Sequence, residues 1–329
     1  MAASHREETP LSFGEPFRGL DASAFEAFEP RKWSSNMFNM ERMRLRDQLL
    51  SVGHGIEGAV ARDRHLRWDV TPHSPSVFNA KKVSELVLYF TRSEEHQKAI
   101  APLLDARIAL PDQISDAGEH HRHLHLGVRL FHEGAEAGLM CHSTAWLDVM
   151  NLLNRCRQPA EALEFVRLVR SMPAGSSARV GPGLEVPAPE FDVEHLKRLE
   201  EAVLNESFLI RFGRAMAPGD PALAASVFAP TLRDLLTGLL PLWDFMAWRP
   251  ASNFLVAAMP NGVANLKDAP IIAHDGSIID FGVGAKVRLV DGVFAGRTGV
   301  VSEIDARGHV RVLLGKVAVR LDARQVRPA

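Results

Sequence analysis

Residues 284–328 read GAKVRLVDGVFAGRTGVVSEIDARGHVRVLLGKVAVRLDARQVRP, and this stretch decides the fold at one end of the chain. Short apolar runs begin at Lys286, Gly299, His309 and Val317, and Gly, Asp or Arg follows each run at a turn position. Strands this short, with turn signals roughly every eight to ten residues, are typical of a small all-β barrel. The sequence therefore predicts a β-barrel over residues 284–329.

The barrel residues are basic, whereas the rest of the chain is acidic. Residues 284–329 hold nine Lys and Arg against four Asp and Glu, a charge of about +5. Because the whole chain carries −2, about −7 belongs to everything before residue 284. A basic module on an acidic body is expected if only the module meets a polyanion. A solvated barrel with scattered arginines is the alternative, and charge alone does not separate the two.

Composition places the chain among ordinary globular proteins. Of its 329 residues, 46% are hydrophobic and 24% are charged. The length is sufficient for two domains, or for one large domain with an appendage. No apolar run reaches the roughly eighteen residues of a membrane-spanning helix, and the first residues lack the apolar core of a secretory signal. Cys141 and Cys156 are the only cysteines and have no CxxC spacing. We therefore expect a cytoplasmic protein with no membrane partner.

Periodicity in the body predicts mixed helices and strands. Residues 85–91 (ELVLYFT) indicate a buried strand, and the period-two pattern of 124–132 with 137–142 indicates a hairpin that carries His132 and His142. A helix is expected from Thr144 to Cys156, and another over the apolar run 232–248. The order of these elements over residues 17–155 is similar to that of a small bacterial family of unknown function, which implies no activity for this chain.

The predicted fold is an α+β body with a helical extension and a small all-β SH3-like barrel at the C-terminus. The Pro/Gly/Ser-rich stretch 172–189 predicts a break between the body and its extension. The expected parts are a flexible leader (1–16), an α+β domain (17–170), a linker or long loop (171–190), a helical segment (191–250), a loop-rich connection (251–283) and the barrel (284–329).

A histidine-rich stretch, HHRHLH at residues 120–125, is the clearest candidate for metal chemistry. If it is a strand, His121, His123 and His125 share one face, and neutral imidazoles suit zinc, copper or iron. Same-face residues on a strand lie about 6–7 Å apart, so three of them reach one ion only if the strand is curved. A transition-metal site and a polar or anion-binding strand face therefore both stay open. No other cofactor is expected.

Sequence motifs for catalysis are weak. No G-x-S-x-G nucleophile elbow is present, and the GxGxxG match at residues 53–58 lies late in a predicted helix instead of after a strand. The catalytic residues of any enzyme reaction therefore stay unassigned, and the sequence favours a protein that is not an enzyme.

The glycine and apolar pattern of the predicted barrel resembles the KOW motif of NusG-type transcription elongation factors and of several ribosomal proteins. The resemblance covers about 45 residues, roughly one seventh of the chain. It implies an SH3-like barrel that binds RNA, RNA polymerase or ribosomal components. The residues that carry it are Val287, Leu289, Gly292, Phe294, Gly296, Gly299, Val300 and Val301.

The functional hypothesis follows from this module. Glycines at 292 and 296 permit tight turns, and the loop around Phe294 lets the backbone approach a ligand closely. We expect a non-enzymatic accessory factor that binds a nucleic acid or nucleoprotein, such as RNA, the ribosome or RNA polymerase. The alternatives are a metal-dependent enzyme with a site on the His-rich strand and a purely protein-binding adaptor. The candidate contacts of the barrel are Arg288, Phe294, Arg297, Arg307, Arg311 and Lys316.

Overall fold

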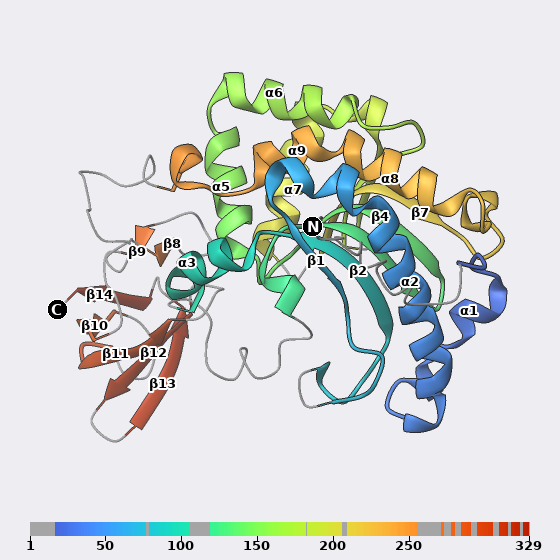
Figure 1. Ribbon diagram of the computed structural model, residues 1–329. Helices are drawn as coiled ribbons and strands as arrows, with labels where there is room; N and C mark the ends of the chain where they lie inside the picture. The colour runs from blue at the N-terminus through green and yellow to red at the C-terminus, as the bar shows by residue number, and fades with distance from the viewer. Residues whose placement is uncertain are drawn as a thin grey trace, which may run out of the picture.

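A computed structural model shows an α+β protein, as the sequence predicts, with two larger antiparallel sheets and one two-stranded pair among the residues it describes (Figure 1). None of the helices in this described part is long and apolar enough to cross a membrane. The described residues are 17–76, 79–105, 119–181, 183–205, 209–255, 271–272, 278–279, 284–290, 295–304, 309–314, 317–322 and 325–328.

The body is built on a seven-stranded sheet of order β1-β2-β3-β4-β7-β5-β6. Every neighbouring pair in it is antiparallel. The predicted strand and hairpin are confirmed as β2, β3 and β4. The strands are β1 (Arg67–Val70), β2 (Glu85–Thr91), β3 (His125–Phe131), β4 (Gly134–His142), β5 (Ser177–Val180), β6 (Leu184–Pro187) and β7 (Leu209–Met216).

One face of this sheet packs against helices and forms the main core. Alternate strand residues such as Leu88, Val128 and Leu139 are fully buried there, together with Leu49 from α2 and Leu152 from α5. Because successive strand residues point to opposite faces, the remaining residues form a second face. The helices are α1 (Ala22–Glu26), α2 (Asn39–Val60), α3 (Glu94–Asp105), α5 (Trp146–Cys156), α6 (Pro159–Arg170), α7 (Val193–Asn205), α8 (Phe228–Gly238) and α9 (Leu240–Met246).

Three expectations for the body differ from the structure. Residues 171–190, expected to be a linker, contain β5 and β6, and the expected helical segment contains β7, which pairs with both β4 and β5. Turn residues dominate the local sequence there, but hydrogen bonding to a distant strand decides the structure. The expected helix over 232–248 is two helices, because Pro241 lies at the start of α9.

The described residues between 284 and 328 form a second, curled antiparallel sheet with its own core. Its order is β13-β12-β11-β10-β14, and Val287, Leu289, Val301, Val310 and Val312 are buried in it. The four apolar runs of the sequence are confirmed as strands. They are β10 (Lys286–Leu289), β11 (Thr298–Ile304), β12 (His309–Leu314) and β13 (Val317–Asp322), and β14 (Val326–Pro328) pairs with β10.

Between the two sheets, the described residues include only the short pair β8 (Ile271–Ile272) and β9 (Ile278–Ile279) after residue 255. The expected leader, 1–16, and most of the expected connection, 251–283, lie outside the described residues.

Candidate functional site

The second face of the seven-stranded sheet is polar yet buried. His125 and Glu136 are 1% and 3% exposed, and Arg211 is 1% exposed. Buried charged groups are stable only when they are paired and hydrogen-bonded. The residues of this face include Glu85 and Tyr89 of β2, His125 and Arg129 of β3, Glu136 and His142 of β4, Arg179 of β5 and Arg211 of β7.

Glu136 is the centre of an ion-pair network on this face. One carboxylate oxygen accepts from Arg129 at 3.2 Å, and the other accepts from Arg179 at 2.6 Å. Arg211 lies 3.7 Å from the same carboxylate and also donates to Glu185 at 2.9 Å. The network joins β3, β4, β5, β6 and β7, so it fixes the relative positions of the strands below the candidate site.

A row of glycines crosses the middle of the face. Gly127, Gly138 and Gly213 are register neighbours on β3, β4 and β7. A Cβ atom would lie 2.0 Å from the Leu88 carbonyl oxygen at Gly127 and 2.0 Å from the Ala137 carbonyl oxygen at Gly213. No larger residue fits these positions without moving the backbone. The row therefore leaves a strip of the sheet free of side chains.

Histidine rings gather beside this strip. The ring of His120 stacks on Tyr89, the register neighbour of Gly127, with centroids 5.1 Å apart. The rings of His120 and His121 lie 4.0 Å apart, and His121 stacks on His142 at 4.5 Å with an interplanar angle of 14°. Imidazoles from the turn at residues 119–122 and from β4 thus lie side by side on this face.

Hydrogen bonds hold the turn that carries His120 and His121. This turn is a short 3-10 helix, Glu119–Arg122. On its C-terminal side, the Leu124 N–H donates to Asp148 and the Leu124 carbonyl accepts from Thr91, both at 3.1 Å. The Thr144 hydroxyl donates to the His121 carbonyl at 2.9 Å. The two imidazoles are therefore placed by bonds to β2, to α5 and to the segment that precedes α5.

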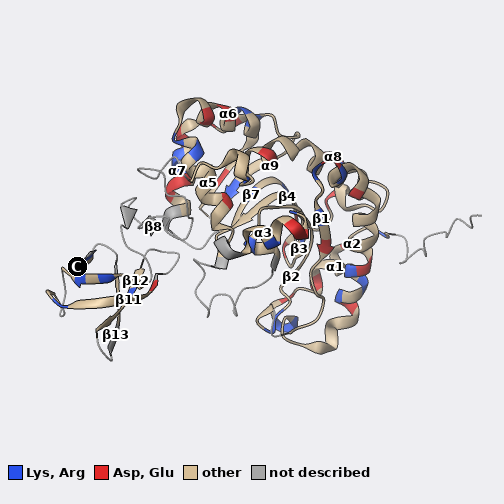
Figure 2. Cartoon of the chain, turned by 60° about the vertical axis from the view of Figure 1, so that its left-hand side comes forward, with Lys and Arg blue, Asp and Glu red and all other residues tan. Residues whose placement is uncertain are grey.

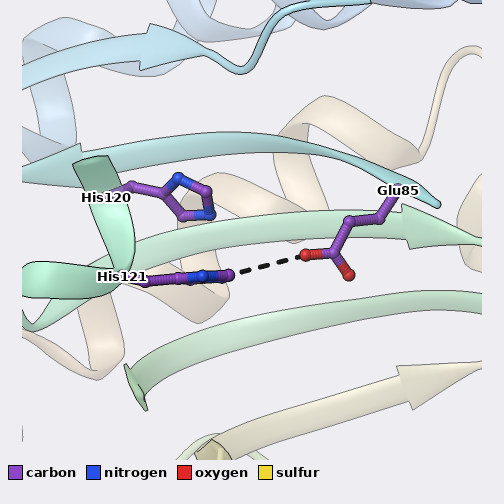
Figure 3. A group of neighbouring side chains, drawn as sticks. All are labelled: Glu85, His120 and His121. Atoms are coloured by element: carbon purple, nitrogen blue, oxygen red, sulfur yellow. Dashed lines mark ion pairs between the residues drawn. The ribbon is translucent and has the colours of Figure 1, made fainter. Parts of the chain in front are cut away.

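Glu85, at the start of β2, adds a carboxylate to the cluster (Figure 3). Its Oε1 atom lies 3.9 Å from His121 Nε2, and its Oε2 atom accepts from Arg129 Nε at 2.9 Å. One oxygen of Glu85, one ring nitrogen of His120 and one ring nitrogen of His121 all lie within 4.8 Å of one another. This is a donor set of two imidazoles and one carboxylate.

The electrostatics keep these imidazoles neutral at neutral pH. Burial lowers the pKa of His120 and of His121 well below its usual value, and the neighbouring histidines and Arg129 lower it further. Burial likewise lowers the pKa of His125 and of His142 to about 4. The neutral form of imidazole binds metal ions, because one of its ring nitrogens has a free lone pair.

The three histidines predicted as ligands lie in different surroundings, and the ring centroids of His121 and His125 are 6.4 Å apart. The expected strand begins only at His125, because residues 119–122 form a 3-10 turn. His121 faces Glu85, whereas His125 donates through Nδ1 to the His123 carbonyl at 3.1 Å. His123 is buried near Arg92 and Asp148, where burial and then Arg92 lower its pKa to about 3.

Two members of the cluster were missed at the sequence level, Glu85 and His120. A charged residue at the start of the apolar strand ELVLYFT is the only local signal for Glu85. The approach of Glu85 to the histidine turn depends on the pairing of β2 with β3 and on the 3-10 turn, and neither is visible in the spacing of residues.

The outward surface of the C-terminal sheet is the second candidate site. Arg288 of β10 is directly opposite Arg327 of β14, and Arg311 of β12 is directly opposite Arg320 of β13. All four side chains are exposed, and so is Arg297. Figure 2 shows basic residues, in blue, on strands close to the C-terminus. The other predicted contacts, Phe294, Arg307 and Lys316, lie outside the described residues.

Comparison with known proteins adds no relative: neither the protein-family models nor the curated proteins that were searched include a match to this chain. The KOW resemblance of residues 284–328 therefore rests on the residues themselves. The functional argument likewise depends on the two candidate sites and their chemistry.

Proposed function

We propose that residues 284–329 form a KOW-like, SH3-like barrel that binds the phosphate backbone of single-stranded RNA. Through this contact the barrel attaches the acidic body to an RNA-containing assembly, such as the ribosome or a transcribing RNA polymerase. The observation that carries the proposal is the register that sets Arg288 opposite Arg327 and Arg311 opposite Arg320.

Like charges directly opposite each other destabilise an antiparallel sheet, by up to about 1 kcal/mol for a pair. The Arg288–Arg327 pair therefore favours a surface that meets an anion, and Arg311 and Arg320 add positive charge to the same exposed face. The planar guanidinium fork matches the oxygens of a phosphate group. Arg311 also lies 3.5 Å from Glu303, but an exposed ion pair of this kind contributes little to stability.

An apolar strip separates the two arginine pairs. Val300 of β11 and Leu313 of β12 are register neighbours, and they are 39% and 40% exposed. Along β11, Val300 lies between Thr298, which is opposite Arg288, and Glu303, which is opposite Arg311. A strand of RNA can therefore contact arginines on both sides while a sugar or base covers the apolar strip. This arrangement supports single-stranded RNA as the ligand.

The salt dependence of RNA binding by the full chain tests the proposal. Fluorescence anisotropy with a labelled single-stranded RNA should show affinity that falls steeply between about 50 and 200 mM salt, with a log–log slope of about −0.7 per phosphate contacted. The double variant R288Q/R327Q should bind RNA more weakly. Its log–log slope should be less steep, by the amount that corresponds to the loss of about 1 to 2 phosphate contacts.

The matched control is R233Q, since Arg233 is an exposed arginine on α8 of the body that pairs with Asp234. This variant should bind RNA as the unmodified chain does. Absence of binding at low salt, or equal loss in R233Q and R288Q/R327Q, contradicts the proposal. A stoichiometric partner that survives nuclease treatment in a pulldown, with no RNA binding, would instead support the protein-binding adaptor.

A further inference from the structure

We infer that Glu85, His120 and His121 bind one divalent transition-metal ion of the zinc class on the polar face of the body. The inference is independent of RNA binding by the C-terminal sheet, because the body and that sheet have separate cores. It replaces the strand-based set of His121, His123 and His125 by a set whose atoms converge (Figure 3).

The unsatisfied nitrogens are the first reason. His120 Nε2 and His121 Nδ1 are buried, and neither has a hydrogen-bond partner among the described residues. His120 as a whole is only 4% exposed. A buried polar atom without a partner is destabilising, so an imidazole that is placed this way is expected to have a ligand. The two imidazoles come from adjacent residues, and the other ring nitrogen of His121, Nε2, is the one that faces Glu85.

The orientation of the carboxylate is the second reason. Arg129 donates to Oε2 of Glu85, which leaves Oε1 directed toward His121 at 3.9 Å. Such an outer partner fixes the orientation of a metal-binding carboxylate and keeps it ionised. Arg129 itself is held from the other side by Glu136. The ion-pair network thus orients the Glu85 carboxylate through Oε2 and leaves Oε1, the atom that faces His121, without a bond to an arginine.

The spacing of the donor atoms also fits an ion. Zinc bonds to nitrogen and oxygen are about 2.0–2.2 Å long, so two ligands of a tetrahedral site lie about 3.4 Å apart. The three donor atoms lie within 4.8 Å of one another, so they must move together by about 1 Å when the ion binds. Rotation of the three side chains can supply a shift of this size.

The remaining histidines of the cluster surround the set. His142 stacks on His121, and its Nδ1 atom is engaged by the Thr144 hydroxyl at 2.9 Å. His125 uses Nδ1 for the His123 carbonyl. Two histidines and one carboxylate leave a coordination position open, as in zinc sites that bind a water molecule or a small anion. Imidazole and carboxylate together favour zinc, iron or nickel over calcium or magnesium.

The experiment uses full-length protein without an affinity tag, stripped of metal with a chelator and then titrated with Co²⁺ and, in competition, Zn²⁺. We expect one ion to bind per chain. Bound Co²⁺ should show the visible absorption of a low-coordinate site with nitrogen and oxygen ligands. H120Q and H121Q should each weaken binding at least about 100-fold, and R129Q about 10–100-fold.

The control is H132Q, because His132 is an exposed histidine in the turn at the far end of the β3–β4 hairpin. It should bind the metal as the unmodified chain does. Circular dichroism of each variant verifies folding, and X-ray absorption of the loaded unmodified chain gives the ligand set without any substitution. Failure to bind one equivalent, affinity unchanged in H120Q and H121Q, or a ligand set without imidazole would each overturn the inference.

Discussion

Asp148→Ala is expected to destabilise the body strongly, because Asp148 is the buried partner of a buried arginine. The carboxylate, 1% exposed, accepts from Arg92 and from the backbone N–H groups of Leu124 at 3.1 Å and Trp248 at 2.8 Å. These bonds join the first turn of α5 to the end of β2, to the start of β3 and to the residue that follows Ala247, the C-cap of α9.

The magnitude follows from the charge that is left behind. Arg92 is 4% exposed, and removal of its partner leaves a buried guanidinium whose main remaining bond is to the Trp248 carbonyl at 3.1 Å. Breaking a buried pair in this way costs about 3–5 kcal/mol. Since domains are stable by about 5–15 kcal/mol, the variant should lose a large share of its free energy of unfolding.

Urea denaturation followed by tryptophan fluorescence measures this loss, and Trp248 is a reporter next to the pair. Asp63→Ala, at an exposed carboxylate, is the control and should change the free energy of unfolding by less than about 0.5 kcal/mol. The apolar double variant R92M/D148L should recover part of the stability lost in D148A, because no unpaired guanidinium is left, although the N–H groups of Leu124 and Trp248 still lack their acceptor. A loss below about 1 kcal/mol in D148A, or no recovery in the double variant, would refute the reasoning.

The same pair predicts a pH dependence. Burial alone would raise the pKa of Asp148, but Arg92 and the N–H groups of Trp248 and Leu124 outweigh it, so the pKa lies below its usual value. A carboxylate of this kind contributes stability above its unfolded pKa of about 3.9, and the contribution is lost as pH falls through the folded pKa. The stability difference between the unmodified chain and D148A should therefore be constant from pH 7 to about pH 5 and shrink below about pH 4.

Three further perturbations test the packing, the thiols and the metal site. Gly213→Ala should lower the melting temperature strongly, because the new Cβ would lie 2.0 Å from the Ala137 carbonyl oxygen. Gly55→Ala in α2, which has open space around it, should be neutral or stabilise the chain by up to about 1 kcal/mol. Equal melting temperatures of the two variants would contradict this expectation. Burial raises the pKa of Cys141 well above its usual value and that of Cys156 to about 12, so iodoacetamide at pH 8 should label both thiols only after unfolding, and rapid labelling of the native chain would be the opposite result. Zinc at about 100 times its dissociation constant should stabilise the chain by about 2.7 kcal/mol, and this gain should vanish in H121Q; a gain retained in H121Q would place the ion elsewhere.

Periodicity was sufficient for the strands whose partners are close in sequence. The alternation in Leu124–Leu130 and the apolar run Glu85–Thr91 identify β2, β3 and β4, and the turn residues of 284–328 identify the strands of the second sheet. In each case the local pattern and the tertiary structure favour the same state, so no long-range information is needed.

Longer-range pairing explains what the sequence did not show. β5 has only four residues among Gly and Pro, and it is a strand because Ala178 pairs with Phe212 of β7. The set of Glu85, His120 and His121 was likewise not visible in the sequence. Alternation suggests that His121, His123 and His125 share a face, but the turn at Glu119–Arg122 reorients the first histidine toward a carboxylate that lies 36 positions earlier in the chain.

Photocrosslinking of single-stranded RNA to the full chain, followed by mass-spectrometric mapping of the linked peptides, tests the proposed RNA contact most directly. Crosslinks are expected in peptides from residues 284–328; they should weaken in R288Q/R327Q and disappear at high salt. Crosslinks that map to residues 17–255, or crosslinks that persist unchanged in R288Q/R327Q, would contradict the proposal that the C-terminal sheet is the RNA-binding surface.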